Sequence, residues 1–467
     1  MWSEFYEGEN IQMGKPKSQW QTKAKKRAEK PENSLAAVFR ILNHFFANFH
    51  MWISEMTDPR NEAYITYTQM DLIILAILKN VCSISSMRSM DENFNEDICI
   101  ENLSKLTGDV ALKEIPHYDT LNYYLERLSP EELSIVRAKM IKSLISNRVF
   151  DANKLFNKHW QVILDGTGLF YFKEKHCDNC LKEVHKNDDG TIETRYYHKV
   201  LEAKLLLADN IIISLDTEFI ENESENVSKQ DCELNAAKRL LCRLKERYPR
   251  LNICLQGDAL YAAESIMNIC KSNNWKYIFT QKEGRQRAAF EAYDTLEVCD
   301  KTKVTNICSE KGTGYFYNHI EGLAGKTQVM NIFEYSYENK DKDGNIKEHH
   351  MQWLTNINLT RGKLEKIIIA GRRRWKIENE GFNVQKNILY DIQHINSRNN
   401  TAMKNHYLIT QIADIIMQLY LASEKVQKTV NVTLRNIAAW ILESFRKQCL
   451  TQQDIEWMKK RTSIYLQ

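Results

Sequence analysis

Apolar residues recur at helical spacing through the first third of the chain. The segments LAAVFRILNHFF (35–46) and MDLIILAILKNV (70–81) repeat Leu, Ile, Val and Phe every three or four positions, as amphipathic helices do. Similar segments continue as far as PEELSIVRAKMIKSLISNRVF (130–150). Several short helices with tight connections predict a small helical bundle, which we assign to residues 35–155.

The pattern changes near residue 160. WQVILDGTGLF (160–170) is an apolar run that ends in Asp-Gly, which is typical of a buried strand. Two β-rich runs, 196–208 and 210–220, are joined at Asp209-Asn210 and predict a hairpin. Helix, strand, helix and strand are then predicted at 229–247, 252–258, 261–273 and 275–281. This order indicates a mixed sheet and differs from the alternating order of dinucleotide-binding folds, whose glycine motif is also absent from the sequence.

The rest of the sequence indicates that the α/β core is formed by two segments of the chain. Residues 283–360 are β-rich with turn signals, and 361–390 return to helical spacing. We therefore expect an α/β core formed by 156–282 and 361–420, interrupted by a β-rich insertion at 283–360. A C-terminal helical region, 421–467, completes the expected organisation.

Composition narrows the class of protein. Of the 467 residues, 43% are hydrophobic and 27% charged, as in globular proteins. The net charge is only +3, so affinity for nucleic acid must come from local clusters. One cluster lies in residues 1–34, a flexible arm in which GKPKSQWQTKAKKRAEK has seven Lys or Arg and one Glu. The arm is either a solvated terminus or a segment that binds along the phosphate backbone of nucleic acid.

Hydropathy and cysteine content indicate in which cellular compartment the protein is expected. The sequence has no apolar run of roughly 18 residues and no signal-peptide pattern at its start, so we expect no membrane association. Eleven cysteines without a secreted framework predict mostly free thiols in a reducing compartment. The expectation is a cytoplasmic protein.

Two aspartates follow predicted strands. Asp165 is expected at the end of the first strand, and Asp258 at the end of the fourth, NICLQGD. Each alone is explained by a turn, since Asp-Gly and Gly-Asp are common there. If the two strands are neighbours, both carboxylates emerge at the same edge. A third carboxylate from the helix at 361–390, Glu378 or Glu380, would complete an oxygen-rich pocket for two Mg²⁺ or Mn²⁺ ions.

Three stretches in this order, VILDGTG, ICLQGDALYA and RWKIENEGFNVQK, resemble the DDE transposases of bacterial insertion sequences. The resemblance covers about residues 160–420 and implies a ribonuclease H-like core. It implies that Asp165, Asp258 and Glu378 are the catalytic, metal-binding carboxylates, and that Glu380, on another side of the helix, is a reserve for the third position.

The same resemblance implies a phosphate clamp. Arg374 matches the Arg of the family's Y-R-E-K signature, whereas Gly371 occupies the Tyr position and Gln385 the Lys position. Lys386, the next residue, is close to the same helix face. A salt-bridge ladder on a solvated helix is the alternative explanation for this charge, because Arg374 and Glu378 are four residues apart.

Further DNA contacts are expected from cations near the triad and from one aromatic residue. Solvated surfaces are the alternative for the cations Lys282, Arg285, Arg372 and Arg373. Trp353, at the end of the insertion, could stack on an unpaired base, with core packing as the alternative. IPHYDTLNYYLERL (115–128) could be the recognition helix of a helix-turn-helix, although small bundles often have other roles.

A second metal site is suggested by cysteine spacing. Cys177 and Cys180 form a C-x2-C pair followed by His185 and His198, a set that can make a closed tetrahedral zinc site. A hairpin with incidental cysteines is the alternative. Cys232, at a predicted helix start, is more simply a packed helix residue than a reactive thiol.

These expectations combine into one function. The chain is expected to be a DNA transposase that cleaves the ends of its element and joins them to target DNA. Its partners would be double-stranded DNA, namely terminal inverted repeats and target, and a second copy of the chain in a homodimer. The alternatives are a metal-dependent nuclease without strand transfer and a catalytically silent DNA-binding protein.

Overall fold

A computed structural model describes residues 33–186, 190–222, 229–281, 286–320, 330–340, 344–427 and 432–466. Most of the expected basic arm, 1–34, lies outside these ranges. All eleven cysteines lie within them and none forms a disulfide. In the described part of the chain, no helix is long and apolar enough to cross a membrane.

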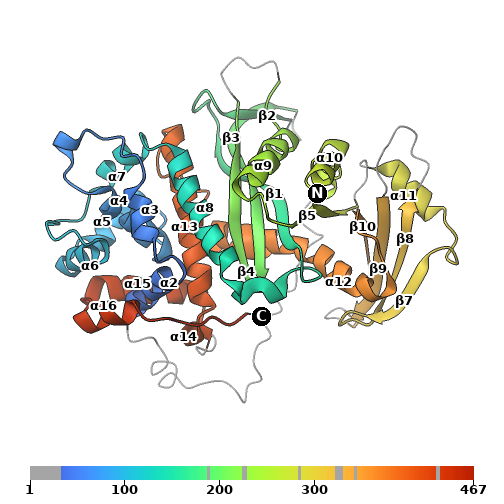
Figure 1. The fold of residues 1–467 in the computed structure, drawn as a ribbon. Coiled ribbons are helices and arrows are strands. Elements are labelled where there is room, and N and C mark those ends of the chain that lie inside the picture. The colour runs from blue at the N-terminus through green and yellow to red at the C-terminus, as the bar shows by residue number, and fades with distance from the viewer. Residues whose placement is uncertain are drawn as a thin grey trace.

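Helices from both ends of the chain form one lobe (Figure 1). The N-terminal helices are α2 Ser34–Phe45, α3 Phe49–Ser54, α4 Gln69–Val81, α5 Met87–Phe94, α6 Asp97–Thr107, α7 Tyr118–Leu125 and α8 Pro130–Ser146. The C-terminal helices are α13 Asn400–Leu421, α14 Glu424–Gln427, α15 Leu434–Lys447 and α16 Gln452–Met458. α13 packs against α2, α4, α7 and α8, while α15 and α16 pack against α2. The two helical regions, which the sequence pattern separates, therefore share one core.

The centre of the molecule is a mixed sheet. Its strands are β1 Trp160–Phe172, β3 Ile192–Ala208, β4 Ile211–Ile220, β5 Ile253–Gly257 and β6 Lys276–Thr280. They lie in the order β4-β3-β1-β5-β6, with β3 antiparallel to β1 and β4, and with β1, β5 and β6 parallel. The helices α9 Glu233–Arg247 and α10 Glu264–Ser272 follow β4 and β5. This order confirms the expected α/β class with a ribonuclease H-like core, and the predicted hairpin lies between β3 and β4.

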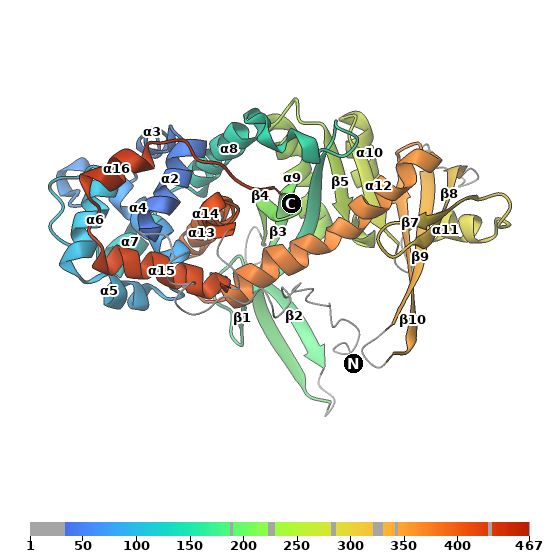
Figure 2. The same cartoon turned by 90° about the horizontal axis from the view of Figure 1, so that it is seen from below.

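The β-rich insertion extends this sheet. It contains α11 Arg287–Asp294, β7 Thr302–Ile307, β8 Gly312–Ile320, β9 Met330–Lys340 and β10 Ile346–Thr355. β10 pairs antiparallel with β6, where Trp353 lies opposite Thr280. At the other edge, β2 Leu181–Lys186 pairs with the outer half of β3, and these two strands project from the molecule (Figure 2). The strands consequently form one ten-stranded sheet.

The helical segment after β10 is not one regular helix. α12 Arg361–Arg372 passes into a 3₁₀ turn, Arg373–Trp375, and then into two π-helical segments, Ile377–Phe382 and Val384–Ile388. The segment crosses the molecule from the β-rich part toward the helical lobe (Figure 2). Wide π-helical turns are rare and often mark functional positions.

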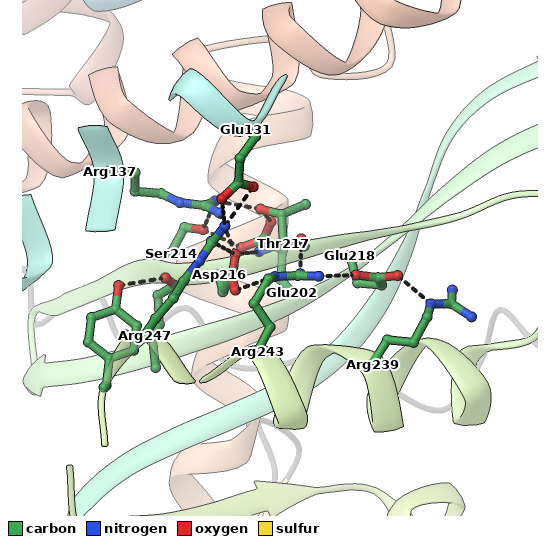
Figure 3. A network of polar contacts seen from close by, with 12 residues as sticks. Glu131, Arg137, Glu202, Ser214, Asp216, Thr217, Glu218, Arg239, Arg243 and Arg247 are labelled. Atoms are coloured by element: carbon green, nitrogen blue, oxygen red, sulfur yellow. Dashed lines mark hydrogen bonds and ion pairs between the residues drawn. The ribbon is translucent and has the colours of Figure 1, made fainter. Parts of the chain in front are cut away.

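A buried ionic network joins the helical lobe to the sheet (Figure 3). Arg137 of α8 is 1% exposed and donates hydrogen bonds to Ser214 and to Asp216, both at 2.8 Å, and to Thr217 at 2.5 Å. Ser214 and Thr217 in turn donate hydrogen bonds to Glu202, which is fully buried. These contacts satisfy polar groups that would otherwise be costly to bury.

α9 continues the network to the surface. Arg243 and Arg247 also bind Asp216, at 2.8 and 3.0 Å. Arg239, whose side chain is 46% exposed, pairs with Glu218 and Asp231 at the outer end. One buried aspartate is thus held by three arginines from two helices.

Candidate functional site

Asp165 and Asp258 lie on neighbouring strands of the sheet. β1 and β5 are parallel neighbours in which Ile163 is paired with Gln256. Asp165 and Asp258 each come two residues later, so they lie at the same level of the two strands. Only Asp258 follows the end of its strand; the predicted strand end at Asp165 is wrong, because β1 continues to Phe172 and Asp165 is paired with Glu202 of β3. The Asp258 carboxylate also caps the 3₁₀ turn Ala259–Tyr261, accepting a hydrogen bond from the Leu260 amide at 2.8 Å.

The first π-helical segment places Glu378 beside this edge. Ile377 and Phe382 are buried in a small apolar cluster with Ile163 of β1 and with residues of β3 and β4. Glu378 follows Ile377 directly, and its side chain remains 41% exposed. Packing of the apolar neighbours therefore holds this carboxylate close to Asp165 of β1.

Electrostatics show that these carboxylates interact. Burial and the Glu378 carboxylate raise the pKa of Asp165 to about 7; Arg374 opposes the shift, and Glu233 and Asp258 add to it. Like charges held together in a partly dry site disfavour ionisation. Glu378, Glu233 and Asp258 thus all lie within electrostatic range of Asp165.

Glu233 was missed by the sequence analysis. It is the first residue of α9, and it accepts hydrogen bonds from Tyr261 and Lys199, both at 2.5 Å. A Cβ atom at Gly166 would come within 2.4 Å of its carboxylate oxygen, so a larger residue at 166 would require the Glu233 side chain to move. The available signal was its position at a helix start, where the sequence analysis considered only the neighbouring Cys232, which is exposed.

Two cations border the carboxylates. Arg374 is 7% exposed at its side chain and donates to Glu378 at 2.9 Å, with its guanidinium 4.0 Å from the centre of the Trp375 ring. Its Nε has no hydrogen-bond partner among the residues that the structure describes. Burial lowers the pKa of Lys386, and the Asp165 carboxylate counters that shift. Lys386 therefore lies close to the carboxylate group.

The π-helical geometry explains why Lys386 rather than residue 385 faces the site. Two turns of α-helix take about seven residues, whereas the wider π-helix takes more than eight. Lys386 is eight residues after Glu378 and returns to the same side. Gln385 is instead fully buried, donating to Gln411 at 3.0 Å and to Asp414 at 2.9 Å.

The position of the Trp353 indole accounts for the glycine at position 371. Trp353 is 2% exposed and stacks on Phe333, with ring centres 5.0 Å apart. A Cβ at Gly371 would lie 2.8 Å from the indole nitrogen. The indole thus fills the space beside the helix that a larger residue at 371 would need. Base stacking by Trp353 is corrected to core packing, because the ring is almost fully buried in an apolar cluster.

Replacing Gly371 with alanine is expected to destabilise the protein by about 1–2 kcal/mol. Overpacking costs about 1–3 kcal/mol, and the gain in helix propensity offsets up to about 1 kcal/mol. Gly362→Ala on the same helix is the matched control, since a Cβ there meets no atom within 4 Å; it should leave stability equal or higher. Urea unfolding of both variants measures the effect, and equal shifts would contradict the steric explanation.

The remaining predicted DNA-contact cations are paired within the protein or not described. Arg372 binds Glu310 at 2.7 Å, and Arg373 binds Asp209 at 2.8 Å. Lys282 and Arg285 lie outside the described residues. The alternative third carboxylate, Glu380, pairs with Lys376 at 2.8 Å.

A separate Cys/His cluster lies at the base of the projecting β2–β3 hairpin. Its members His176, Cys177, Cys180 and His198 have ligand atoms within 4.8 Å of one another. This corrects the predicted set: His198 and both cysteines take part, but His185 is exposed on β2 opposite Glu193, and His176 replaces it. The fourth ligand was missed because C-x2-C spacing fixes the cysteines but not which histidine the hairpin turns toward them.

Comparison with known proteins adds little. No protein-family model matches the sequence, and no curated protein sequence matches it. Among solved structures, the cryo-EM structure of a piggyBac transposase synaptic complex with hairpin DNA has a TM-score of 0.41 and 9% identity, covering 93% of this chain and 86% of that chain. We draw nothing about function from a similarity this low.

Proposed function

We propose that the chain is a DNA transposase of the bacterial insertion-sequence type, which cuts the ends of its element and joins them to target DNA. The proposal is supported by the matching positions of Asp165 and Asp258 on neighbouring parallel strands and by the Glu378 carboxylate, which helps to raise the pKa of Asp165 to about 7. Groups whose pKa is strongly shifted by burial and by a specific charged neighbour occur preferentially at functional sites.

The donor set fits divalent metal. Mg²⁺ and Mn²⁺ prefer carboxylate oxygens, and a cation would relieve the repulsion that raises the pKa of Asp165. We assign Asp165, Asp258 and Glu378 as ligands of two such ions. When bound, the ions would lower the pKa of an attacking water or hydroxyl and stabilise charge on the leaving oxygen.

The other residues would position DNA and the ligands. Lys386 and Arg374 would hold phosphate oxygens, for which Arg374 would release Glu378 and turn its partner-free Nε toward the strand. Glu233, fixed by Tyr261 and Lys199, would hold the edge of the β1 strand in place through its contact with Gly166. Arg372 and Arg373 are assigned to DNA only if their ion pairs open.

The partners follow from this chemistry. We propose double-stranded DNA, both the terminal inverted repeats and the target, with two copies of the chain joining two ends in a homodimer. The helical lobe and the basic arm at 1–34 would recognise the ends, with the protein working in the cytoplasm.

Incubation with a DNA fragment bearing the element's terminal repeats, a target plasmid and Mg²⁺ tests the proposal. The expected products are cleaved ends and strand-transfer joints, both lost with EDTA. Cleavage without joints would indicate a nuclease, and binding without cleavage a silent DNA-binding protein; either result would overturn the proposal.

Lys386→Ala is expected to slow cleavage about 10- to 100-fold, because a hydrogen bond to a charged group contributes about 1.5–3 kcal/mol. The salt dependence of DNA binding should also weaken, its slope falling by about 0.9 for one lost phosphate contact. Lys376→Ala is the matched control, since that lysine pairs with Glu380 and the Asp209 carbonyl. Equal losses in both variants would remove Lys386 from the site.

A further inference from the structure

We propose that His176, Cys177, Cys180 and His198 bind one Zn²⁺ ion in a closed, structural site. The site is independent of the carboxylate chemistry and of the proposed function. Its ion would fasten the connection between β1 and β2 to β3, at the base of the projecting hairpin. The cysteines come from that connection and His198 from β3.

The distances match tetrahedral zinc. The two Sγ atoms are 3.5 Å apart, and each lies 3.4 Å from Nε2 of His198. Zinc bonds of about 2.3 Å to sulfur and 2.0–2.1 Å to nitrogen, at tetrahedral angles, give separations of about 3.8 and 3.5 Å. A disulfide needs sulfur atoms about 2.05 Å apart, so the cysteines are arranged as a pair of thiols.

His176 gives independent evidence for a missing partner. Both of its ring nitrogens are buried, and neither has a hydrogen-bond partner among the residues that the structure describes. The ring is held in place by stacking on Phe172, with centres 4.4 Å apart. Buried polar groups without partners are rare and need an explanation, and a metal bound to one nitrogen supplies it.

The set of ligands indicates a structural rather than a catalytic ion. Two thiolates and two imidazoles fill a tetrahedron and leave no position for water or substrate. Along β3, His198 lies four residues from Glu202, the residue paired with Asp165. That spacing is about 13 Å in a strand, which is too far for one ion to serve both groups.

Neighbouring contacts show what the ion would hold together. Asn222, just after β4, donates to the Cys180 carbonyl at 2.9 Å, and Asn179 donates to the Asn222 carbonyl at 2.9 Å. Asn400, at the start of α13, donates to Asn179 at 3.2 Å. The loop therefore already joins β4 and α13, and the ion would add β3 to this junction.

The test measures metal bound to the purified full-length chain by elemental analysis. We expect one equivalent of zinc, and visible absorption of tetrahedral thiolate-bound cobalt after Co²⁺ exchange. Cys177→Ser, Cys180→Ser and His176→Ala should each lower zinc affinity by more than about 100-fold, beyond the loss typical of residues that only orient a ligand. Absence of zinc and cobalt binding in the wild-type chain would overturn the proposal.

Two controls separate this ligand set from its alternatives. His185→Ala should keep the full equivalent of zinc, as should Cys232→Ser, which removes a thiol outside the cluster. His176→Cys should restore binding with a three-cysteine set, which guards against variants that merely misfold. Zinc lost in His185→Ala, or kept in Cys180→Ser, would refute the assignment.

Discussion

Replacing Asp165 with asparagine is expected to reduce DNA cleavage by at least about a thousandfold without unfolding the protein. A metal-binding carboxylate supports several kcal/mol of transition-state stabilisation, and each 1.36 kcal/mol is a factor of ten in rate. Asparagine keeps the size of the side chain and removes one of four clustered negative charges. Folding stability should therefore be unchanged or slightly higher, because burial and neighbouring carboxylates already raise the pKa of Asp165.

Single-turnover cleavage assays in Mg²⁺, with thermal unfolding alongside, measure both effects. Glu380→Gln is the matched control: it neutralises a carboxylate two residues from Glu378 that is paired with Lys376 on the other side. It should retain cleavage. Metal-dependent cleavage that survives in Asp165→Asn, or that is lost equally in Glu380→Gln, would refute the assigned triad.

Replacing Arg137 with methionine is expected to give the largest loss of stability, about 3–5 kcal/mol. Breaking a buried ion pair from one side leaves an uncompensated charge. Here the change leaves Lys204 as the remaining buried cation that stabilises ionised Glu202, and it removes three hydrogen bonds to β4. Arg243 and Arg247 still bind Asp216, which places the expected value toward the lower end.

Denaturant unfolding checks this value. Arg239→Met is the comparison, because its side chain is 46% exposed at the outer end of the same network, and exposed pairs contribute about 0–1 kcal/mol. A loss in Arg137→Met no larger than that in Arg239→Met would show that the buried network does not stabilise the interface between lobe and sheet.

The core of the site could be predicted because local rules determine it. An apolar run that contains or precedes an aspartate specifies a strand, so Asp165 and Asp258 needed only a parallel pairing to meet. The end of the strand was predicted correctly for Asp258 but not for Asp165, because β1 continues to Phe172. Glu378 was reached through the resemblance of its helix to a known pattern. Its exact direction depends on π-helical turns, which arise from packing of Ile377 and Phe382 and have no simple periodicity in the sequence.

The residues that were not predicted correctly are positioned by contacts between segments that are distant in the sequence. His176 was missed in favour of His185 because strand register, set by the pairing of β2 with β3, decides which histidine faces the cysteines. Trp353 and Gly371 are 18 positions apart, and only the tertiary structure reveals their contact. Glu233 approaches Asp165 across 68 residues for the same reason.

The pairing of β10 with β6 has a mechanical consequence. The β-rich part is attached to the core by backbone hydrogen bonds between neighbouring strands, and α12 returns from it toward the site. A force on the outer strands β7 and β8 is therefore transmitted through β9, β10 and β6 to β5, the strand that Asp258 follows. The hydrogen-bonded strands should resist deformation along this path. The β-rich part should therefore move together with the site as one body.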